Sequence, residues 1–263
     1  MRISLIQSAL VWEQPSANYI HFENIICQLK FKTDLVILPE LFNSGFSMRT
    51  ECFAEQEQGF GLNWLKRLAS QNHVVIMGSL AIKTALGIKN RLHIVLPDET
   101  CFFYDKKHLF RMGHEHLHYS PGSLQTVFTF MDFQIMGLIC YDLRFPVWSR
   151  NHLKKDAFKY DVLVYVANWP ERRHYAWKHL LIARAIENQA YVIGVNRIGT
   201  DGNNIAHAGE SMLIDPNGQI LLNCGLHNAT VMTATLDKST LQILRNEFPV
   251  GKDADAFTLD NPN

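Results

Sequence analysis

The chain has 263 residues, of which 47% are apolar and 11% aromatic, and this composition excludes a disordered or fibrous protein. The 25 lysines and arginines balance the 25 acidic residues, so no net charge draws the chain to nucleic acid or to an anionic membrane. No apolar run approaches the ~18 residues of a membrane helix, and the five cysteines form no C-x-x-C pair. These features predict a cytoplasmic protein that acts on a small molecule and has neither a disulfide framework nor a zinc site.

Short β-branched segments alternate with longer amphipathic ones along the chain, which is typical of layered α/β proteins. The first segment is read as a strand and not as a signal peptide. The predicted strands are residues 2–7, 34–38, 73–82, 91–97, 101–104, 126–130, 133–140, 161–166, 190–196, 208–214, 219–224 and 229–235. The predicted helices are residues 15–31, 59–72, 145–159, 172–188 and 237–247.

So many strands with helices between them favour two sheets stacked face to face, each covered by helices on its outer side. This is a four-layer αββα sandwich. We expect one domain over residues 1–263, in which residues from about 249 to 263 form a C-terminal tail. Phe257 and Leu259 are the side chains expected to anchor that tail.

The first candidate site residue in chain order is Glu40. It follows the predicted strand 34–38 and Pro39, and turn-forming residues come soon after it. A carboxylate at the end of a strand can act as a general base. A solvated loop residue is the simpler alternative.

The second candidate is the lysine pair Lys106 and Lys107, which directly follows the aromatic strand 101–104. We assign Lys107 as the functional cation of the pair. The alternative is ordinary surface charge.

The third candidate is Cys140, at the end of an apolar strand that leads into Tyr141, Asp142, Leu143 and Arg144. A nucleophile and the backbone N-H groups that follow a sharp turn are the groups that acyl transfer requires. A packed core cysteine is the alternative, since free cysteines are among the most buried residues.

Together these three segments resemble the nitrilase superfamily of carbon-nitrogen hydrolases, whose members present a Glu, Lys, Cys triad in that chain order. The matching text is Leu38-Pro39-Glu40, then Tyr104 to Phe110, then Gly137 to Pro146. The resemblance covers nearly the whole chain, and it also implies the αββα sandwich. The chain has no glycine-rich motif that would bind phosphate, so we expect no nucleotide cofactor, and we expect no metal.

The resemblance implies a covalent mechanism in which the Cys140 thiol attacks the carbonyl carbon. Glu40 would transfer protons, while the ammonium of Lys107 and the backbone N-H of Tyr141 would stabilise the oxyanion. Glu115 precedes the turn Ser120-Pro121-Gly122, as the second glutamate of many members does, and would orient the lysine or the substrate.

An alternative for Glu115 is a loop carboxylate in a weak metal patch with the neighbouring histidines 114, 116 and 118. The substrate cleft is less well specified. Phe46 and Trp169 could form its walls or could pack in the core. Arg144, Arg172 and Arg173 are candidate partners of a substrate carboxylate, because guanidinium binds carboxylate bidentately. For Arg144 we favour another role, in which it stabilises its own loop through Asp142.

Within the superfamily the chain resembles most closely the bacterial omega-amidases. The sequence segments that show this resemblance include Asn168-Trp169-Pro170 and Ala183 to Gln189. It implies hydrolysis of the terminal amide of 2-oxoglutaramate or 2-oxosuccinamate with release of ammonia. An N-carbamoyl amide hydrolase, a nitrilase and a non-catalytic binding protein remain alternatives. The resemblance also implies a homodimer that pairs through a helix within residues 144–159.

Overall fold

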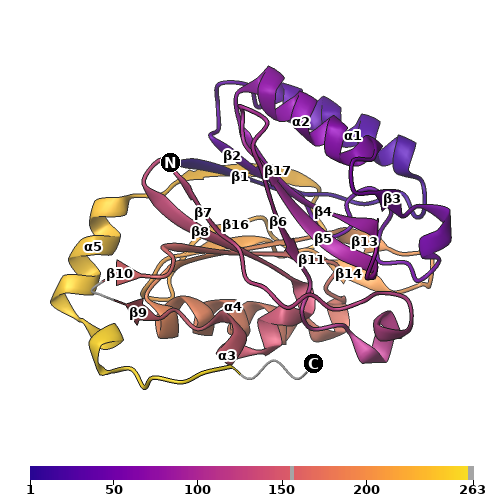
Figure 1. Ribbon diagram of the computed structural model, residues 1–263. Helices are drawn as coiled ribbons and strands as arrows, with labels where there is room; N and C mark the ends of the chain where they lie inside the picture. The colour runs from indigo at the N-terminus through magenta and orange to yellow at the C-terminus, as the bar shows by residue number, and fades with distance from the viewer. Residues whose placement is uncertain (155–156, 260–263) are drawn as a thin grey trace.

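A computed structural model of the protein describes residues 1–154 and 157–259. It contains two large sheets that lie face to face, with helices on both outer sides (Figure 1). The first sheet has the strand order β17 (Thr230–Thr235), β1 (Arg2–Gln7), β2 (Leu35–Ile37), β4 (Val75–Thr84), β5 (Gly87–Val95) and β6 (Cys101–Asp105), with β3 (Glu55–Gln56) beside β4. The second has the order β16 (Ile220–Asn223), β15 (Met212–Ile214), β12 (Tyr191–Asn196), β11 (Val162–Ala167), β8 (Phe133–Ile139) and β7 (Val127–Phe130). The predicted αββα sandwich is confirmed.

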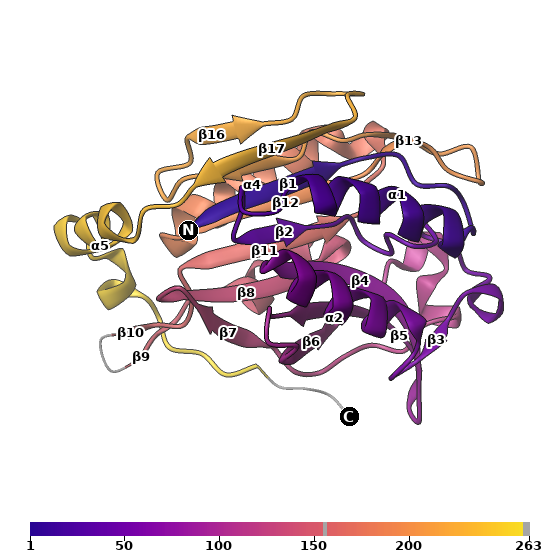
Figure 2. The same ribbon diagram turned by 90° about the horizontal axis from the view of Figure 1, so that it is seen from above.

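Helices α1 (Pro15–Gln28) and α2 (Phe60–Asn72) cover the outer face of the first sheet (Figure 2). The residues of α1 that face the sheet are Tyr19, Phe22 and Ile26, whose spacing of three and four places them on one side of a helix. Along each strand, successive side chains point to opposite faces of the sheet. Ile3 and Leu5 of β1 enter the core between the sheets, whereas Ile6 packs beneath α1 and α2.

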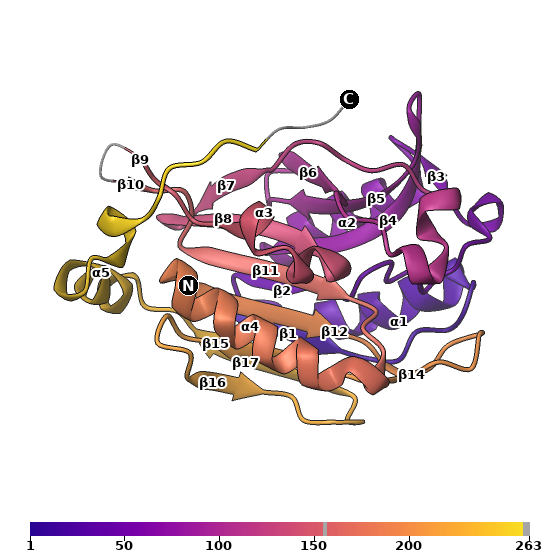
Figure 3. The same cartoon turned by 90° about the horizontal axis from the view of Figure 1, so that it is seen from below.

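Helix α4 (His174–Asn188) covers the second sheet, and Figure 3 shows it lying across that face. Its buried residues Trp177, Leu181 and Ala185 recur every four positions and pack on the sheet. The helix can approach β12 closely because Gly194 has no side chain. A Cβ at Gly194 would lie 2.5 Å from Leu181 Cδ1. A similar close approach occurs between the sheets, where a Cβ at Gly137 would lie 2.5 Å from Leu92 Cδ2.

The segment 145–159 differs from its predicted helix. Only the short α3 (Pro146–Ser149) is helical, and β9 (Leu153–Lys154) and β10 (Ala157–Phe158) pair after it; residues 155 and 156 lie outside the described residues. The physical reason is Asn151, whose amide donates to the carbonyls of Tyr160 and Asn188 at 2.9 and 3.1 Å. These bonds tie the backbone to neighbouring segments and compete with a helix.

The predicted strand 208–214 is also divided. Gly209 and Glu210 adopt positive φ angles of 79° and 56°, and this left-handed turn separates β14 (Ala206–Ala208) from β15. Strand β14 pairs instead with β13 (Ile198–Thr200) in a small hairpin. The chain then continues through β16, β17 and α5 (Lys238–Glu247) to the C-terminal segment.

In the C-terminal segment, the ring of Phe257 lies 4.7 Å from that of His152. Leu259, the other predicted anchor, is 38% exposed. The last four residues of the predicted tail, 260–263, lie outside the described residues. Among residues 1–154 and 157–259, no helix combines the length and the apolar character needed to cross a membrane.

Candidate active site

Four polar or reactive side chains meet because several strands end at the same edge of the sandwich. Strands β2 and β4 are parallel, and two antiparallel steps through β5 give β6 the same direction. In the second sheet β8 and β11 are parallel. Glu40 follows β2, Lys106 follows β6, Cys140 follows β8 and Asn168 follows β11. The carboxyl ends of these strands therefore form the floor of the site.

Lys106 lies between two glutamates in a buried cluster. Its Nζ donates to Glu40 Oε1 at 2.9 Å and to both carboxylate oxygens of Glu115 at 2.9 and 3.0 Å. Glu40 and Glu115 are fully buried and Lys106 is 1% exposed. Glu115 is thus not a solvated loop carboxylate, and Glu40 is not a solvated loop residue. Each is paired with a buried ammonium, as buried charges require.

The assignment of the functional cation to Lys107 is corrected by this geometry. The ladder between β5 and β6 continues to Lys106, whose N-H donates to the carbonyl of Asn90 at 2.9 Å. Because side chains alternate along a strand, Tyr104 and Lys106 both point inward. Lys107 lies on the other side of this alternation, and its ammonium lies over the ring of Trp148 at 5.4 Å.

Two asparagines, Asn90 and Asn168, complete the hold on Glu40. Asn90 Nδ2 donates to Glu40 Oε1 at 2.8 Å, and the backbone N-H of Asn168 donates to Glu40 Oε2 at 2.8 Å. Sequence reasoning did not assign either asparagine. The available signals were a polar residue inside the buried strand β5 and a polar residue directly after β11.

Cys140 occupies a sharp turn between β8 and the 3-10 turn η4 (Cys140–Arg144). Its φ angle is 45°, a left-handed conformation that is strained for a residue with a side chain. Cys140 is 9% exposed and lines a cavity, so it is more than a packed core residue. Tyr141 follows at the start of η4, where the first N-H groups of a helical turn lack partners within the turn.

Asp142 fixes the turn that carries Cys140. One of its oxygens accepts from the N-H of Ile139 at 3.0 Å and from the hydroxyl of Tyr104 at 2.8 Å. The other accepts from the backbone N-H of His108 at 3.0 Å and bonds to its Nδ1 at 2.8 Å. The carboxylate thereby joins the end of β8 to the segment that follows Lys106.

The buried charges shift the titration of the cluster. Burial raises the pKa of the Cys140 thiol well above its usual range; the charge of Glu40 and a hydrogen bond with it add to the rise, and Lys106 opposes it. Burial alone would lower the pKa of Lys106, but Glu115 and Glu40 outweigh it and raise that pKa. Burial also raises the pKa of Glu115, against the effect of Lys106. At neutral pH the site therefore holds a thiol beside a charged lysine.

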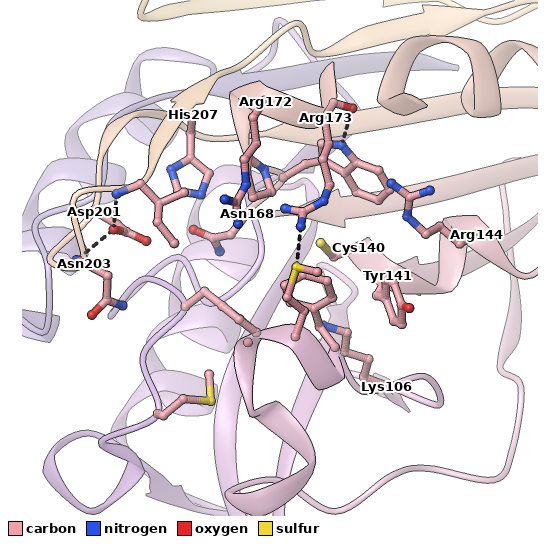
Figure 4. Close-up of a pocket in the computed structure, with 18 residues that line it drawn as sticks. Lys106, Cys140, Tyr141, Arg144, Asn168, Arg172, Arg173, Asp201, Asn203 and His207 are labelled. Atoms are coloured by element: carbon pink, nitrogen blue, oxygen red, sulfur yellow. Dashed lines mark hydrogen bonds between the residues drawn. The ribbon is translucent and has the colours of Figure 1, made fainter. Parts of the chain in front are cut away.

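A cavity of about 110 Å³ opens in front of Cys140 and Lys106 (Figure 4). The five residues predicted to contact the substrate all line it: Phe46, Tyr141, Arg144, Trp169 and Arg172. Phe46 packs near Lys106, whose Nζ lies 5.1 Å from the ring centre. Trp169 is 3% exposed and its indole N-H donates to the carbonyl of Arg173 at 2.8 Å, so it serves both the wall and the core.

The favoured interpretation of Arg144, a partner of Asp142, does not hold. Both oxygens of Asp142 bind Tyr104, His108 and Ile139, and the guanidinium of Arg144 lies over the Trp169 ring at 4.9 Å. Arg172 is exposed at the mouth of the cavity. Within the part of the chain that the structure describes, the histidines at 114, 116 and 118 belong to no group of three residues able to hold a metal ion.

Comparisons with known proteins identify the family of the chain. Residues 2–246 match the model of the family described as carbon-nitrogen hydrolase. The chain is 44% identical to an omega-amidase (YafV) of Escherichia coli K12, over 98% of both chains. It is 35% identical to a 2-oxoglutaramate amidase of Bacillus subtilis, over 95% of this chain and 96% of that one.

Among solved structures, a CN-hydrolase superfamily protein of Xanthomonas campestris with an arsenic adduct in its active site is 40% identical. It covers 99% of both chains and superimposes with a TM-score of 0.97.

Proposed function

Since the chain belongs to the carbon-nitrogen hydrolase family and is a hydrolase of carbon-nitrogen bonds other than peptide bonds, we propose that it hydrolyses the terminal amide of a small carboxylate-bearing substrate. The substrates proposed are 2-oxoglutaramate and 2-oxosuccinamate. The observation that carries the proposal is the hydrogen bond of the Cys140 thiol with the buried Glu40, which is itself paired with Lys106, at the floor of a small cavity. The 2-oxoglutaramate amidase of Bacillus subtilis among its relatives supports the choice of substrate.

The reaction begins with transfer of the thiol proton to Glu40 as the sulfur attacks the amide carbon. A raised thiol pKa means that the nucleophile is formed during attack and is not stored as a thiolate. The oxyanion that forms accepts hydrogen bonds from the ammonium of Lys106 and from the backbone N-H of Tyr141. Glu115 holds that ammonium in place with both of its oxygens.

Collapse of the tetrahedral intermediate breaks the carbon-nitrogen bond. Glu40 returns its proton to the leaving nitrogen, and ammonia departs from a thioester on Cys140. Glu40 then takes a proton from water, which attacks the thioester carbon. The carboxylic acid product leaves and the thiol regains its proton.

The test is the release of ammonia from 2-oxoglutaramate, 2-oxosuccinamate, an N-carbamoyl amino acid and a nitrile. The wild-type protein should act on the first two, and Cys140→Ser should release ammonia at no more than about a thousandth of that rate, because its hydroxyl is a far poorer nucleophile. Equal or faster turnover of the carbamoyl compound or the nitrile would contradict the proposed substrate.

The two neighbouring lysines provide a matched pair of variants. Lys106→Met should lower kcat by about 100- to 1000-fold, as loss of one oxyanion donor does, and Lys107→Met should keep kcat within about threefold. Circular dichroism and urea denaturation check that both variants fold. A Lys107→Met protein that is as inactive as Lys106→Met would restore the original assignment.

We further propose that the enzyme works in the cytoplasm as a homodimer. All five cysteines are free, which suits a reducing compartment. The dimer is proposed from the family resemblance. The helix expected to form its interface within residues 144–159 is reduced to α3, so the contact is assigned to α4, which lies beside the turn of Cys140 and exposes Tyr175 and Ile186.

A further inference from the structure

Three arginines line the cavity in front of Cys140. Figure 4 shows Arg144, Arg172 and Arg173 along one wall, and the charges of Arg144 and Arg172 both act on Arg173. None of the three forms an ion pair with a carboxylate of the described residues. Six other arginines do form such pairs: Arg2, Arg49, Arg67, Arg91, Arg184 and Arg245. A group of like charges without a counterion is unfavourable unless a bound anion completes it.

Arg173 carries the most specific sign of a missing partner. Its Nη1 is buried and has no hydrogen-bond partner among the residues that the structure describes. Its Nη2 contacts only the thioether of Met112, a weak acceptor, at 2.6 Å, and its guanidinium lies 5.4 Å from the ring centre of Phe110. Burial and the charges of Arg172 and Arg144 lower the pKa of Arg173. An acceptor with negative charge in the cavity would relieve both the unpaired donor and the repulsion.

The other charged groups of the cavity do not supply that acceptor. Lys106 is already bound by two glutamates. Asp201 uses Oδ1 to accept the backbone N-H groups of Asn203 and Ile205 at 2.8 and 2.9 Å, and its charge acts on Arg197 and His207. The part of the cavity wall that the three arginines form is therefore positively charged.

We propose that Arg173, with Arg144 beside it, binds the carboxylate of the substrate while the amide carbon faces Cys140. This assignment rests on the proposed function and goes beyond it, because it names the residue that selects amides with an acid group at the far end. Arg144 lies over Trp169 and contributes charge next to Arg173. Arg172 is exposed at the mouth of the cavity, where water and salt screen its charge, so its contribution is smaller than that of Arg173.

Two amides with the same four-carbon chain separate recognition of the carboxylate from recognition of the amide end. Succinamate and butanamide differ only in a carboxylate that replaces a methyl group, and kcat/KM for both is measured on the wild-type protein and on Arg173→Gln. The wild-type protein should prefer succinamate. Arg173→Gln should lose about 10- to 100-fold on succinamate, mainly through KM, as expected for lost hydrogen bonds to a charged group. Its activity on butanamide should change less than about threefold.

Arg111→Gln is the matched control, since it removes the same charge from an exposed arginine that does not line the cavity. It should keep kcat/KM for succinamate within about threefold, and Arg173→Lys should recover part of the loss because lysine binds as a point charge. Binding of succinamate to Cys140→Ser, measured by calorimetry with and without Arg173→Gln, gives the same comparison without turnover. Adding Arg173→Gln to Cys140→Ser should weaken the binding of succinamate by the same factor of about 10- to 100-fold.

Several results would overturn the assignment. These are an equal loss on both amides in Arg173→Gln, an equal loss on succinamate in Arg111→Gln, or binding of succinamate that does not depend on Arg173. Wild-type activity on neither amide nor on 2-oxoglutaramate would instead reject the proposed function, and the binding measurement would still decide the role of Arg173.

Discussion

At the scale of single residues, the site combines one thiol with two carboxylates and one ammonium, all nearly excluded from water. Glu40 and Glu115 share Lys106, so the charged form of the cluster is negative overall. That charge and the burial act in the same direction on Cys140 and keep it protonated. In the proposed mechanism, proton transfer to Glu40 is then the step that creates the nucleophile.

This electrostatic arrangement predicts that Glu40→Gln makes the Cys140 thiol more acidic and at the same time lowers the rate of amide hydrolysis. The substitution removes a negative charge and a hydrogen bond that raise the thiol pKa, so the pKa of Cys140 should fall. The thiolate should therefore form at lower pH in the variant, while amide hydrolysis should fall by at least about 100-fold, because the general base is gone.

The pH dependence of iodoacetamide labelling of Cys140, followed by peptide mass spectrometry, measures this change. In the wild-type protein the labelling rate should rise only above pH 9, the ordinary thiol value. Glu247→Gln, on an exposed helix end, should leave both the labelling profile and the activity unchanged. A thiol pKa that rises in Glu40→Gln would contradict the assigned cluster.

At the scale of elements, the site depends on the turn at Cys140 that follows β8, and this turn needs hydrogen bonds from other segments. Cys140 has a left-handed backbone, and Asp142 stabilises that turn through Ile139, Tyr104 and His108. Asp142 is fully buried, so its hydrogen bonds have no competition from water. The same carboxylate links the nucleophile turn to the segment after β6, and so it also positions Lys106 relative to Cys140.

The substitution Asp142→Asn should weaken both links while keeping the size of the side chain. An amide nitrogen cannot accept the hydrogen bonds of the oxygen it replaces, so the free energy of unfolding should fall by about 2 to 4 kcal/mol. Urea denaturation measures this change. Turnover of 2-oxoglutaramate should also fall, mainly through kcat, because the turn presents Cys140 less accurately.

Asp215→Asn is the control variant for Asp142→Asn. Asp215 also accepts two backbone N-H groups, from Asn217 and Gln219, but it lies in a partly exposed turn. Its replacement should cost at most about 1 kcal/mol and leave kcat unchanged. If the two variants were equally stable, the role given to Asp142 would be refuted.

At the scale of the whole molecule, the two sheets bring together strand ends that are far apart in the chain. Glu40 and Lys106 come from the first sheet, whereas Cys140 and Asn168 come from the second. The core between the sheets fixes their separation, because packed interiors resist sliding. The site therefore exists only when both sheets are formed and stacked.

We predict that two copies of the chain associate as a homodimer in solution. Light scattering after size-exclusion chromatography should give twice the mass of one chain. Glu at position 175 or 186 would place charge on the exposed apolar residues of α4, so Tyr175→Glu with Ile186→Glu should give a monomer. Leu86→Glu, which alters a residue that is 80% exposed far from α4 in the sequence, should remain dimeric. A wild-type monomer would reject the proposal.

The layers, and two of the residues at the candidate site, could be predicted from local patterns along the chain. Apolar periodicity located β1, β8, α2 and α4 to within about two residues, because one face of each element must be buried. Glu40 and Cys140 were predicted because each is a reactive side chain at the end of an apolar strand. Alternation along β6 would have selected Lys106 over Lys107 as well, since Tyr104 and Lys106 share its inner face.

The contacts between the polar groups could not be read from local patterns, because they depend on how the chain folds. The bonds of Asn151 to Tyr160 and Asn188 ended the predicted helix after Ser149, and no local pattern reports such partners. The pairing of Asp142 with His108 and Tyr104 freed Arg144 for the cavity wall, and the burial of Nη1 singled out Arg173 from its neighbour Arg172. Local sequence fixes which face of an element is apolar, but the contacts of a long polar side chain depend on segments brought near it by folding.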